Sequence, residues 1–362
     1  NITNRRIAPP YKQYHSLTNP DFYRSALDQL TVDDTIEYFS FLGLPIVEQT
    51  KGRMYPQNLQ ASSVVDILRL NLEERNVPVY LETKVIDIVV DENGEFILHT
   101  TGALPVFKAQ KVIVATGGVS APETGSDGSI HPILKKLGHR ITPLLPTIVQ
   151  LKLDYPHLKS VAGVRFDALA KVSVDGEIKR TDLDEVLFTP YGISGPAIYT
   201  ICREASLGIF YQKRVLIHLD LFPNQSAKEL ADQLDNHFAI SSHRTLFNAL
   251  NGVLHKRLIP ALVKDARLPS IHLPVSKLSY YDRQRLYGLL KNWTFTCVDT
   301  NGFQAAQATI GGVDTRDVDP DTLESKKIKH LYFCGEVLDV DGDCGGYNLQ
   351  WAWSSAYVAG KA

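Results

Sequence analysis

Four carboxylates and a pair of glycines lie directly before an apolar helical pattern in the stretch GEVLDVDGDCGGYNLQWAWSSAYVAGK, which runs from Gly335 to Lys361. The preceding run HLYF is typical of a buried strand, and ligands of open α/β sheets bind at the carboxyl ends of strands. Glu336 follows this strand, so its carboxylate could hold the hydroxyl groups of a polyol. Gly345 and Gly346 open the helix, where free N–H groups and the helix dipole favour an anion or an electron-rich carbonyl. Together the two features suit the ribityl chain and the pyrimidine edge of a flavin.

Other interpretations of the same stretch stay open at the level of the residues. The aspartates could simply shape an acidic loop that caps the helix. The run DVDGD resembles part of a calcium loop, but it lacks the glutamate at the twelfth position and the second helix of an EF-hand. Cys334 and Cys344 could form a redox dithiol or be two unrelated thiols, because spacing alone does not establish proximity. We expect no metal site.

A second candidate segment is the apolar run KVIVATGG at residues 111–118. It predicts a buried strand that ends in small residues, which let the backbone pass close to a ligand. Val85, in the run YLETKVIDI, could offer backbone groups to an adenine edge, although the pattern by itself indicates only a strand.

The remaining patterns predict the elements that must position these residues. Helices are expected at 31–43, with Thr31 as N-cap, and at 61–76, with Ser62 or Ser63 as N-cap. Strands are expected at 77–90, 95–100 and 111–118, which indicates an α/β sheet with a small antiparallel element. The middle of the chain adds a hairpin at 171–180, further strands and a capping box formed by Ser226 and Glu229.

The pattern of predicted helices and strands changes in the middle of the sequence and returns near its end, which indicates an α/β domain with an insertion. We predict a first part at residues 1–145, an inserted domain at 146–304 and a C-terminal part at 305–362. A helix start is expected near Ser194, as N-cap, and Pro196; such a start is structural by default, but it could also face an anionic substrate.

Composition limits the class of protein. The chain has 362 residues, of which 44% are hydrophobic and 22% charged, as in ordinary globular proteins. Its formal net charge of -2 comes without a long basic run, so no nucleic-acid partner is expected. No apolar run approaches the roughly 18 residues of a membrane span, and the first residues lack the apolar core of a signal peptide. We therefore expect a cytoplasmic protein with a small-molecule substrate, and the sequence leaves its oligomeric state undetermined.

Five blocks of the chain resemble a known family. They are KGRMYPQNLQASSVVDIL, VIVATGGVSAPETGSDG, LFTPYGISGPAI, ATIGGVDTRDVDPDTLESK and LYFCGEVLDVDGDCGGYNLQWAWSSAYVAG. In this order they are similar to the HI0933-like or BaiN-like NAD(P)/FAD-dependent oxidoreductases, which include aminoacetone oxidase. The resemblance implies a Rossmann-like FAD domain of the two-dinucleotide-binding type, interrupted by an inserted mixed α/β substrate domain.

The resemblance also implies the residues that bind the cofactor. They are Val85 beside adenine, the segment Ala115, Thr116, Gly117 and Gly118, the pair Gly335 and Glu336 on the ribityl side, and Gly345, Gly346, Tyr347, Asn348 and Leu349 facing the flavin ring. Family members begin with a G-x-G-x-x-G segment that holds the pyrophosphate, followed by a GGGRCN-x-TN motif. The opening residues, Asn1 to Asn4, look like the tail of that motif. Either a βαβ unit of about 30 residues or more precedes them in a longer protein, or the protein has lost its main phosphate site; we expect the first, because the adjoining motifs are intact.

The implied function is an FAD-dependent oxidoreductase that oxidises or reduces a small organic molecule by two electrons. The flavin would carry the hydride, with oxygen or a transiently bound NAD(P)H as the other partner. No protein residue is assigned as catalytic. Two alternatives remain: a non-catalytic flavin-binding or interaction scaffold, and a flavin-dependent RNA-modifying enzyme.

Overall fold

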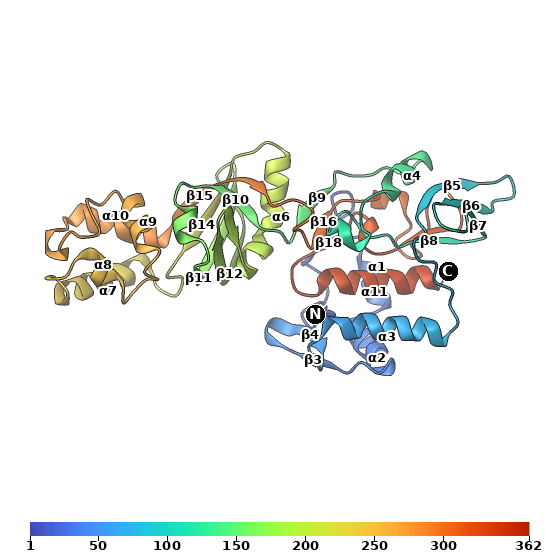
Figure 1. Ribbon diagram of the computed structural model, residues 1–362, viewed down its shortest axis with the longest axis horizontal. Coiled ribbons are helices and arrows are strands. Elements are labelled where there is room, and N and C mark those ends of the chain that lie inside the picture. Colours follow the sequence, from blue (N-terminus) through green and yellow to red (C-terminus); the bar gives the residue numbers. More distant parts are fainter. Residues whose placement is uncertain (362) are drawn as a thin grey trace. The chain divides into compact units, whose positions relative to one another are not determined.

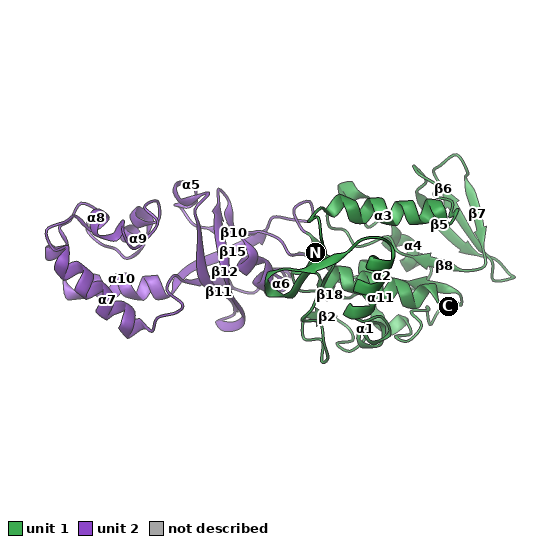
Figure 2. Cartoon of the chain, turned by 90° about the horizontal axis from the view of Figure 1, so that it is seen from below, with its two compact units in different colours: residues 1–146, 307–362 green, residues 147–306 purple. Residues whose placement is uncertain are grey.

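The computed structural model describes residues 1–361, and the chain divides into two compact units (Figure 2). Unit 1 comprises residues 1–146 and 307–362, and unit 2 comprises residues 147–306. Unit 1 therefore contains both chain ends, and unit 2 is a single continuous insertion.

Unit 1 is built from several small sheets and the helices that pack on them. Its antiparallel sheets are β1 (Thr3–Asn4) with β4 (Arg53–Pro56) and β3 (Ile46–Glu48); β5 (Val85–Val90) with β6 (Phe96–Thr100) and β7 (Val106–Ala109); and β2 (Tyr14–His15) with β18 (Asp341–Gly342). A further pair joins β9 (Leu145–Thr147) and β16 (Ala308–Ile310). A parallel pair joins β8 (Val112–Val114) to β17 (Leu331–Phe333).

The C-terminal helix α11 (Tyr347–Gly360) packs against the N-terminal part of the same unit, mainly α1 (Arg24–Gln29) and β1. Gln350, which is fully buried, makes this contact specific. Its side-chain amide donates to the Leu30 carbonyl at 3.1 Å, and its Oε1 accepts from Thr3 Oγ1 at 2.6 Å. Because a buried amide is costly unless it is hydrogen-bonded, these bonds fix the register of α11 against residues 3–30.

The two predicted helices of the N-terminal part form, but only one begins as expected. Helix α2 (Val32–Phe41) starts at Thr31, whose side chain forms a capping box with Asp34, so this N-cap is confirmed. Helix α3 (Ala61–Glu74) starts directly after Gln60, and the prediction of Ser62 or Ser63 as its N-cap is wrong. The Asn58 side chain, which accepts from Gln60 N–H and donates to Ser63, organises this turn instead. The expected strand at 77–90 is also shorter, because only Val85–Val90 pairs.

Unit 2 is a closed antiparallel barrel with helices on it (Figure 1). The strand order is β10 (Leu151–Asp154), β13 (Gly192–Ser194), β12 (Glu177–Thr189), β11 (Arg165–Val174), β14 (Val215–Asp220) and β15 (Trp293–Thr300). The predicted hairpin is the β11–β12 pair. Its turn residues Asp175 and Gly176 both have positive φ, as a two-residue primed turn requires.

Besides the short helix α5 (Leu158–Val161), two segments of unit 2 supply the helices that accompany the barrel. Helix α6 (Pro196–Phe210) packs on β11 and β12, and it begins after Gly195 with φ of 106°, so the predicted N-cap at Ser194 is wrong. Ser194 ends strand β13 instead. Between β14 and β15 the chain forms α7 (Ala227–Ile240), α8 (Leu246–Leu250), α9 (Ile259–Asp265) and α10 (Tyr280–Lys291).

The capping box predicted at the start of α7 is confirmed and offers a direct test. Ser226 Oγ accepts from Glu229 N–H at 3.2 Å, and the Glu229 side chain accepts from Ser226 N–H at 2.7 Å. We expect Ser226→Ala to lower the free energy of unfolding by about 1 kcal/mol, because the helix loses an N-cap acceptor. Urea denaturation followed by circular dichroism measures the change. Ser226→Asn keeps a capping oxygen and should stay near the wild type; equal losses in both variants would contradict the capping role.

Candidate functional site

The parallel pair β8 and β17 brings the two predicted ligand segments together. Val112 is opposite Leu331, and Val114 is opposite Phe333. Beyond the strands, Cys334 N–H donates to the Val114 carbonyl at 3.1 Å. The segments that follow, residues 115–118 and 335–336, therefore leave the carboxyl ends of two adjacent parallel strands. This is the edge at which open α/β sheets bind ligands.

Gly118 lies against the carboxylate of Glu336. A Cβ atom at Gly118 would be 2.6 Å from Glu336 Oε1 and 2.4 Å from Thr309 Oγ1, which are distances that real Cβ atoms do not show. Thr309 is fully buried, and its Oγ1 accepts from Val119 N–H at 3.0 Å. Gly118, Thr309 and Glu336 thus form a close group, which we call the Glu336 cradle, and a side chain at position 118 would force Thr309 or Glu336 to move.

The electrostatics of Glu336 are unusual for a carboxylate. Its Oε1 is inaccessible to solvent and has no hydrogen-bond partner within residues 1–361. Burial raises the pKa of Glu336 to about 7 and is helped by the nearby Asp341, whereas hydrogen bonding with Thr309 acts in the opposite direction. Buried polar atoms normally have a partner, so this oxygen is suited to accept a hydrogen bond from a ligand hydroxyl.

The aspartates after Glu336 organise their own loop. Asp339 is fully buried and accepts from Leu17 N–H at 3.2 Å, Thr18 Oγ1 at 2.9 Å and Ser16 Oγ at 3.1 Å. Burial outweighs these bonds and raises the pKa of Asp339 to about 6. Asp343 contacts His15 Nε2 at 3.1 Å. Because Asp339 and Asp343 are bound to protein groups, they tie the loop to residues 15–18. Residues 1–361 contain no group of three or more metal-ligating side chains placed to hold an ion.

The start of α11 is packed tightly on the first strand. Gly346 is the N-cap with φ of 104°, and a Cβ there would lie 2.5 Å from the Thr3 carbonyl oxygen. Asn4 Nδ2 donates to the Gly345 carbonyl at 2.8 Å. The two glycines therefore let residues 3 and 4 pack closely against the N-terminal end of α11.

The three residues after the glycines differ in what they do. The Asn348 amide bonds both the N–H and the carbonyl of Gly342 at 2.8 Å, which holds the preceding loop. Tyr347 is buried in the core of unit 1, and its carbonyl accepts from Tyr14 Oη. Leu349 is 42% exposed. The predicted contacts of these side chains with a flavin ring remain predictions, and Leu349 is the one whose side chain lies open.

Val85 is the first residue of β5. Its side chain is partly buried and packs against the core of unit 1. Its neighbour Lys84 contacts Asp127 at 2.5 Å, which connects the start of β5 to the loop that follows Gly118. Gly117 lies in the same region, because a Cβ at Gly117 would meet Ser126 Oγ. The start of β5 and residues 115–118 after β8 are thus connected through the loop at 124–128.

Two residues of the site, Thr309 and Asn4, were not predicted from the sequence. Thr309 lies in the block ATIGG, and Asn4 lies in the opening residues, so both belong to segments that carry the family resemblance. No local pattern indicates that Thr309 meets Gly118 or that Asn4 meets Gly345, because these pairs are far apart in the sequence.

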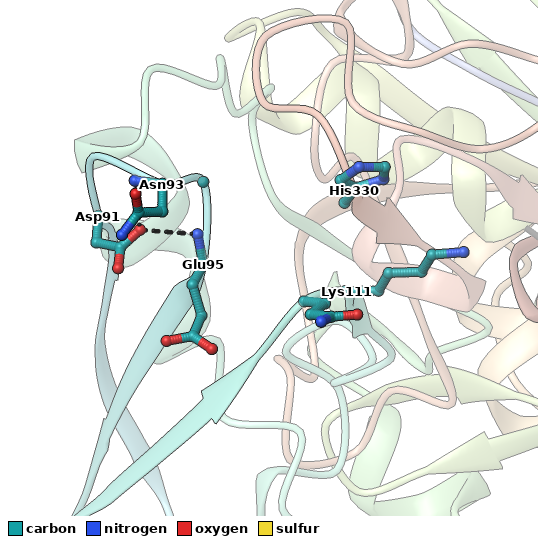
Figure 3. Close-up of a pocket in the computed structure, with 7 residues that line it drawn as sticks. Asp91, Asn93, Glu95, Lys111 and His330 are labelled. Atoms are coloured by element: carbon teal, nitrogen blue, oxygen red, sulfur yellow. Dashed lines mark hydrogen bonds between the residues drawn. The ribbon is translucent and has the colours of Figure 1, made fainter.

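A polar pocket of about 440 Å³ lies elsewhere in unit 1 (Figure 3). Asp91, Asn93 and Glu95 line it from the β5–β6 turn, and Lys111 and His330 line it from the residues just before β8 and β17. It is therefore at the amino ends of the parallel pair, opposite to the Glu336 cradle. Its mixed charges and its position at the wrong end of the strands make it a weaker candidate site.

Comparison with known proteins gives one family match over the whole chain. The model of the HI0933-like protein Rossmann domain matches residues 1–362. The chain is 35% identical to a 3-dehydro-bile acid delta(4,6)-reductase of Clostridium scindens over 362 residues, covering 100% of this chain and 87% of that protein.

Two further relatives have a different name. Ribosomal RNA dihydrouridine synthases of Escherichia coli and Haemophilus influenzae are 32% and 28% identical to the chain over 364 and 363 residues, covering 86% and 85% of those proteins. These alignments include 100% and 99% of this chain. Among solved structures, a point variant of the Escherichia coli quinol fumarate reductase FrdA matches 95% of this chain and 57% of its own, with a TM-score of 0.43 and 14% identity.

Proposed function

This chain belongs to the family of HI0933-like proteins with a Rossmann domain, and from that premise we propose that it is an FAD-dependent reductase of carbon–carbon double bonds conjugated to a carbonyl. The predicted family and the predicted α/β, Rossmann-like fold class are confirmed by the match over the full chain. The oxidoreductase class is supported by the Clostridium scindens relative, which is named as a reductase.

The observation that carries the proposal is the Glu336 cradle. A flavin brings a ribityl chain rich in hydroxyl groups, and Glu336 Oε1 is a buried acceptor with no partner within residues 1–361. Gly118 lets the Thr309 and Glu336 side chains lie close to the end of β8, because a larger residue at position 118 would displace them. The N-terminal end of α11, which follows Gly345 and Gly346, carries the positive end of the helix dipole, and this favours an electron-rich carbonyl. These residues fit FAD, which when bound supplies two-electron hydride chemistry.

The substrate class is drawn from the chemistry that the relatives' names share. A 3-dehydro bile acid with delta(4,6) unsaturation contains double bonds conjugated to a ketone. Dihydrouridine differs from uridine by saturation of a ring double bond that is conjugated to a carbonyl. Both reactions involve an electron-poor double bond of this kind, so we infer the same bond type for the substrate of this chain.

Two substrate candidates follow from this chemistry. The first is a small unsaturated ketone, in agreement with the small organic molecule expected from the sequence. The second is a uridine of an RNA, which two relatives favour by their names. NAD(P)H as the source of electrons is part of the proposal, and no residue is assigned to hold it.

Anaerobic spectroscopy tests the function in two stages. The intact mass and the visible spectrum of the purified protein are recorded first, and we expect bound flavin. The flavin is then reduced and mixed with a steroid 3-oxo-4,6-diene or with an RNA stem–loop that contains unpaired uridines. Reoxidation by one of them identifies the substrate class. A protein without flavin bands, even after addition of FAD, would contradict the reductase and favour the scaffold alternative.

No helix in residues 1–361 combines the length and the apolar character needed to cross a bilayer. A cytoplasmic location remains a prediction.

A further inference from the structure

The charge of the chain is unevenly distributed. Residues 221–292 form the segment between β14 and β15 that contains α7 to α10, which we call the helical layer (Figure 1). It contains ten of the chain's 38 lysines and arginines but only five of its 40 aspartates and glutamates. The helical layer is therefore strongly basic, and the rest of the chain is acidic.

All five acidic side chains of the helical layer already have partners. Asp232 pairs with Lys228, Asp235 with Arg283, and Asp282 with Arg285. Glu229 belongs to the capping box of α7, and Asp265 Oδ2 accepts from Tyr155 Oη and Trp293 Nε1, both at 2.8 Å. None of the layer's carboxylates is left to neutralise its other cations.

Six cations of the layer have no carboxylate partner within residues 1–361, and all six are exposed. They are Arg244, Lys256, Arg257, Lys264, Arg267 and Lys277. Arg257 donates from Nε to the Ser160 carbonyl at 3.1 Å, which orients its guanidinium without neutralising it. Exposed cations without counter-charges are the groups that neutralise a phosphate backbone.

One part of the layer combines these cations with aromatic rings. The Val275 N–H donates to the Arg244 carbonyl at 3.0 Å, so the segments that carry Arg244 and Lys277 lie side by side. Tyr280 and Tyr281 follow in the first turn of α10 and are 69% and 74% exposed. Large exposed aromatic rings beside cations are typical of surfaces on which unpaired bases stack.

The layer is also a firm support. Its apolar residues Leu230, Leu234, Phe238 and Leu262 are buried in the same core as the barrel strands of unit 2. Lys264 therefore projects from the packed helix α9, and the other five free cations lie in the short connections between packed helices.

We propose that the helical layer is the docking surface for a structured RNA, with its free cations on the phosphates and Tyr280 and Tyr281 on unpaired bases. The inference rests on the second substrate candidate, a uridine of an RNA. It revises the expectation of no nucleic-acid partner, which relied on the net charge of -2 and thus averaged a basic segment with an acidic remainder.

The test compares two triple variants of the full chain. Lys256→Gln, Lys264→Gln and Lys277→Gln remove three free cations of the helical layer. Lys12→Gln, Lys111→Gln and Lys329→Gln remove three exposed lysines of unit 1 and change the net charge equally. Binding of a fluorescein-labelled RNA stem–loop with uridines in its loop is measured by anisotropy over a range of salt concentrations.

We expect the layer variant to bind the RNA about 10- to 100-fold more weakly, with a salt slope reduced by about two to three, since each lost phosphate contact lowers the slope by about 0.7 to 0.9. The unit 1 variant should bind as the wild type does. Equal losses in both variants, or no binding by the wild type at low salt, would overturn the proposal. The flavin spectrum and the reduction of the steroid diene are recorded on the same samples, so that failure of RNA docking is distinguished from failure of the reductase. Tyr280→Ala with Tyr281→Ala should weaken binding without changing the salt slope.

Discussion

Replacing Gly118 by alanine should strongly weaken flavin binding while leaving the chain folded. The added Cβ would lie 2.4 Å from Thr309 Oγ1 and 2.6 Å from Glu336 Oε1. Thr309 cannot retreat easily, because it is fully buried and hydrogen-bonded to Val119 N–H and Ser120 Oγ. The Glu336 carboxylate must therefore move, and it is the group that we expect to hold the ribityl chain.

The expected magnitudes separate binding from folding. Overpacking of this kind costs about 1 to 3 kcal/mol of stability, which a large core tolerates. Loss of a hydrogen bond to a charged group, together with the filled space, should weaken FAD binding by about 100-fold or more. Flavin retained after gel filtration and the visible flavin band measure the second effect, and thermal unfolding without flavin measures the first.

Gly360→Ala is the matched control for this variant. Gly360 is in α11 of the same unit, and a Cβ there meets no atom within 4 Å. It should keep the flavin content of the wild type. If Gly118→Ala also kept its flavin, the Glu336 cradle would not be the cofactor site, whatever the family resemblance implies.

The parts of the fold that follow from local chemistry could be predicted from the sequence. Thr31 and Ser226 cap their helices because the capping oxygen and the carboxylate three residues later are neighbours in the chain. The apolar runs at 112–114 and 331–333 predict buried strands for the same reason. The adjacency of their carboxyl ends then follows from parallel pairing, so Gly118 and Glu336 could be placed at one edge.

Two kinds of feature could not be predicted: which polar side chain organises a turn, and which strands pair. The family resemblance implies that Asn348 faces the flavin ring, and this stays a prediction; no pattern indicates that its amide also bonds both backbone groups of Gly342. Gln60 replaces the expected serine caps of α3 because Asn58 organises that turn. The six-stranded closed barrel of unit 2 has no signature in the sequence either, since alternation along a strand does not reveal which strands pair.

Replacing Glu336 by glutamine should stabilise the flavin-free protein and weaken the flavin complex. Burial raises the pKa of Glu336 from 4.5 to about 7, so the folded state holds its proton where the unfolded state has lost it. The Glu336 carboxyl does not lower the free energy of unfolding below about pH 4.5, where it is protonated in both the folded and the unfolded state. The penalty grows with rising pH and is complete above pH 7, where a shift of this size corresponds to about 3 kcal/mol.

Glutamine does not titrate, so the variant should lose less stability between pH 5 and pH 8 than the wild type. Urea midpoints across this range measure the difference, which we expect to approach about 3 kcal/mol. Glu74→Gln, at an exposed position of α3, is the control and should follow the wild-type curve. Parallel curves for Glu336→Gln and the wild type would contradict a buried, uncompensated carboxylate.

The flavin complex should respond in the opposite direction. At pH 8 the wild-type carboxylate is ionised and accepts strongly from a hydroxyl, whereas the amide of glutamine is a weaker, uncharged acceptor. We expect the Kd for FAD to rise by about 10-fold or more in Glu336→Gln, as loss of a charged hydrogen bond predicts. A residue with a purely structural role would lose stability in both forms. An increase of stability without flavin, joined to a decrease of flavin affinity, is the signature of a carboxylate that is held in an unfavourable place because the ligand requires it there.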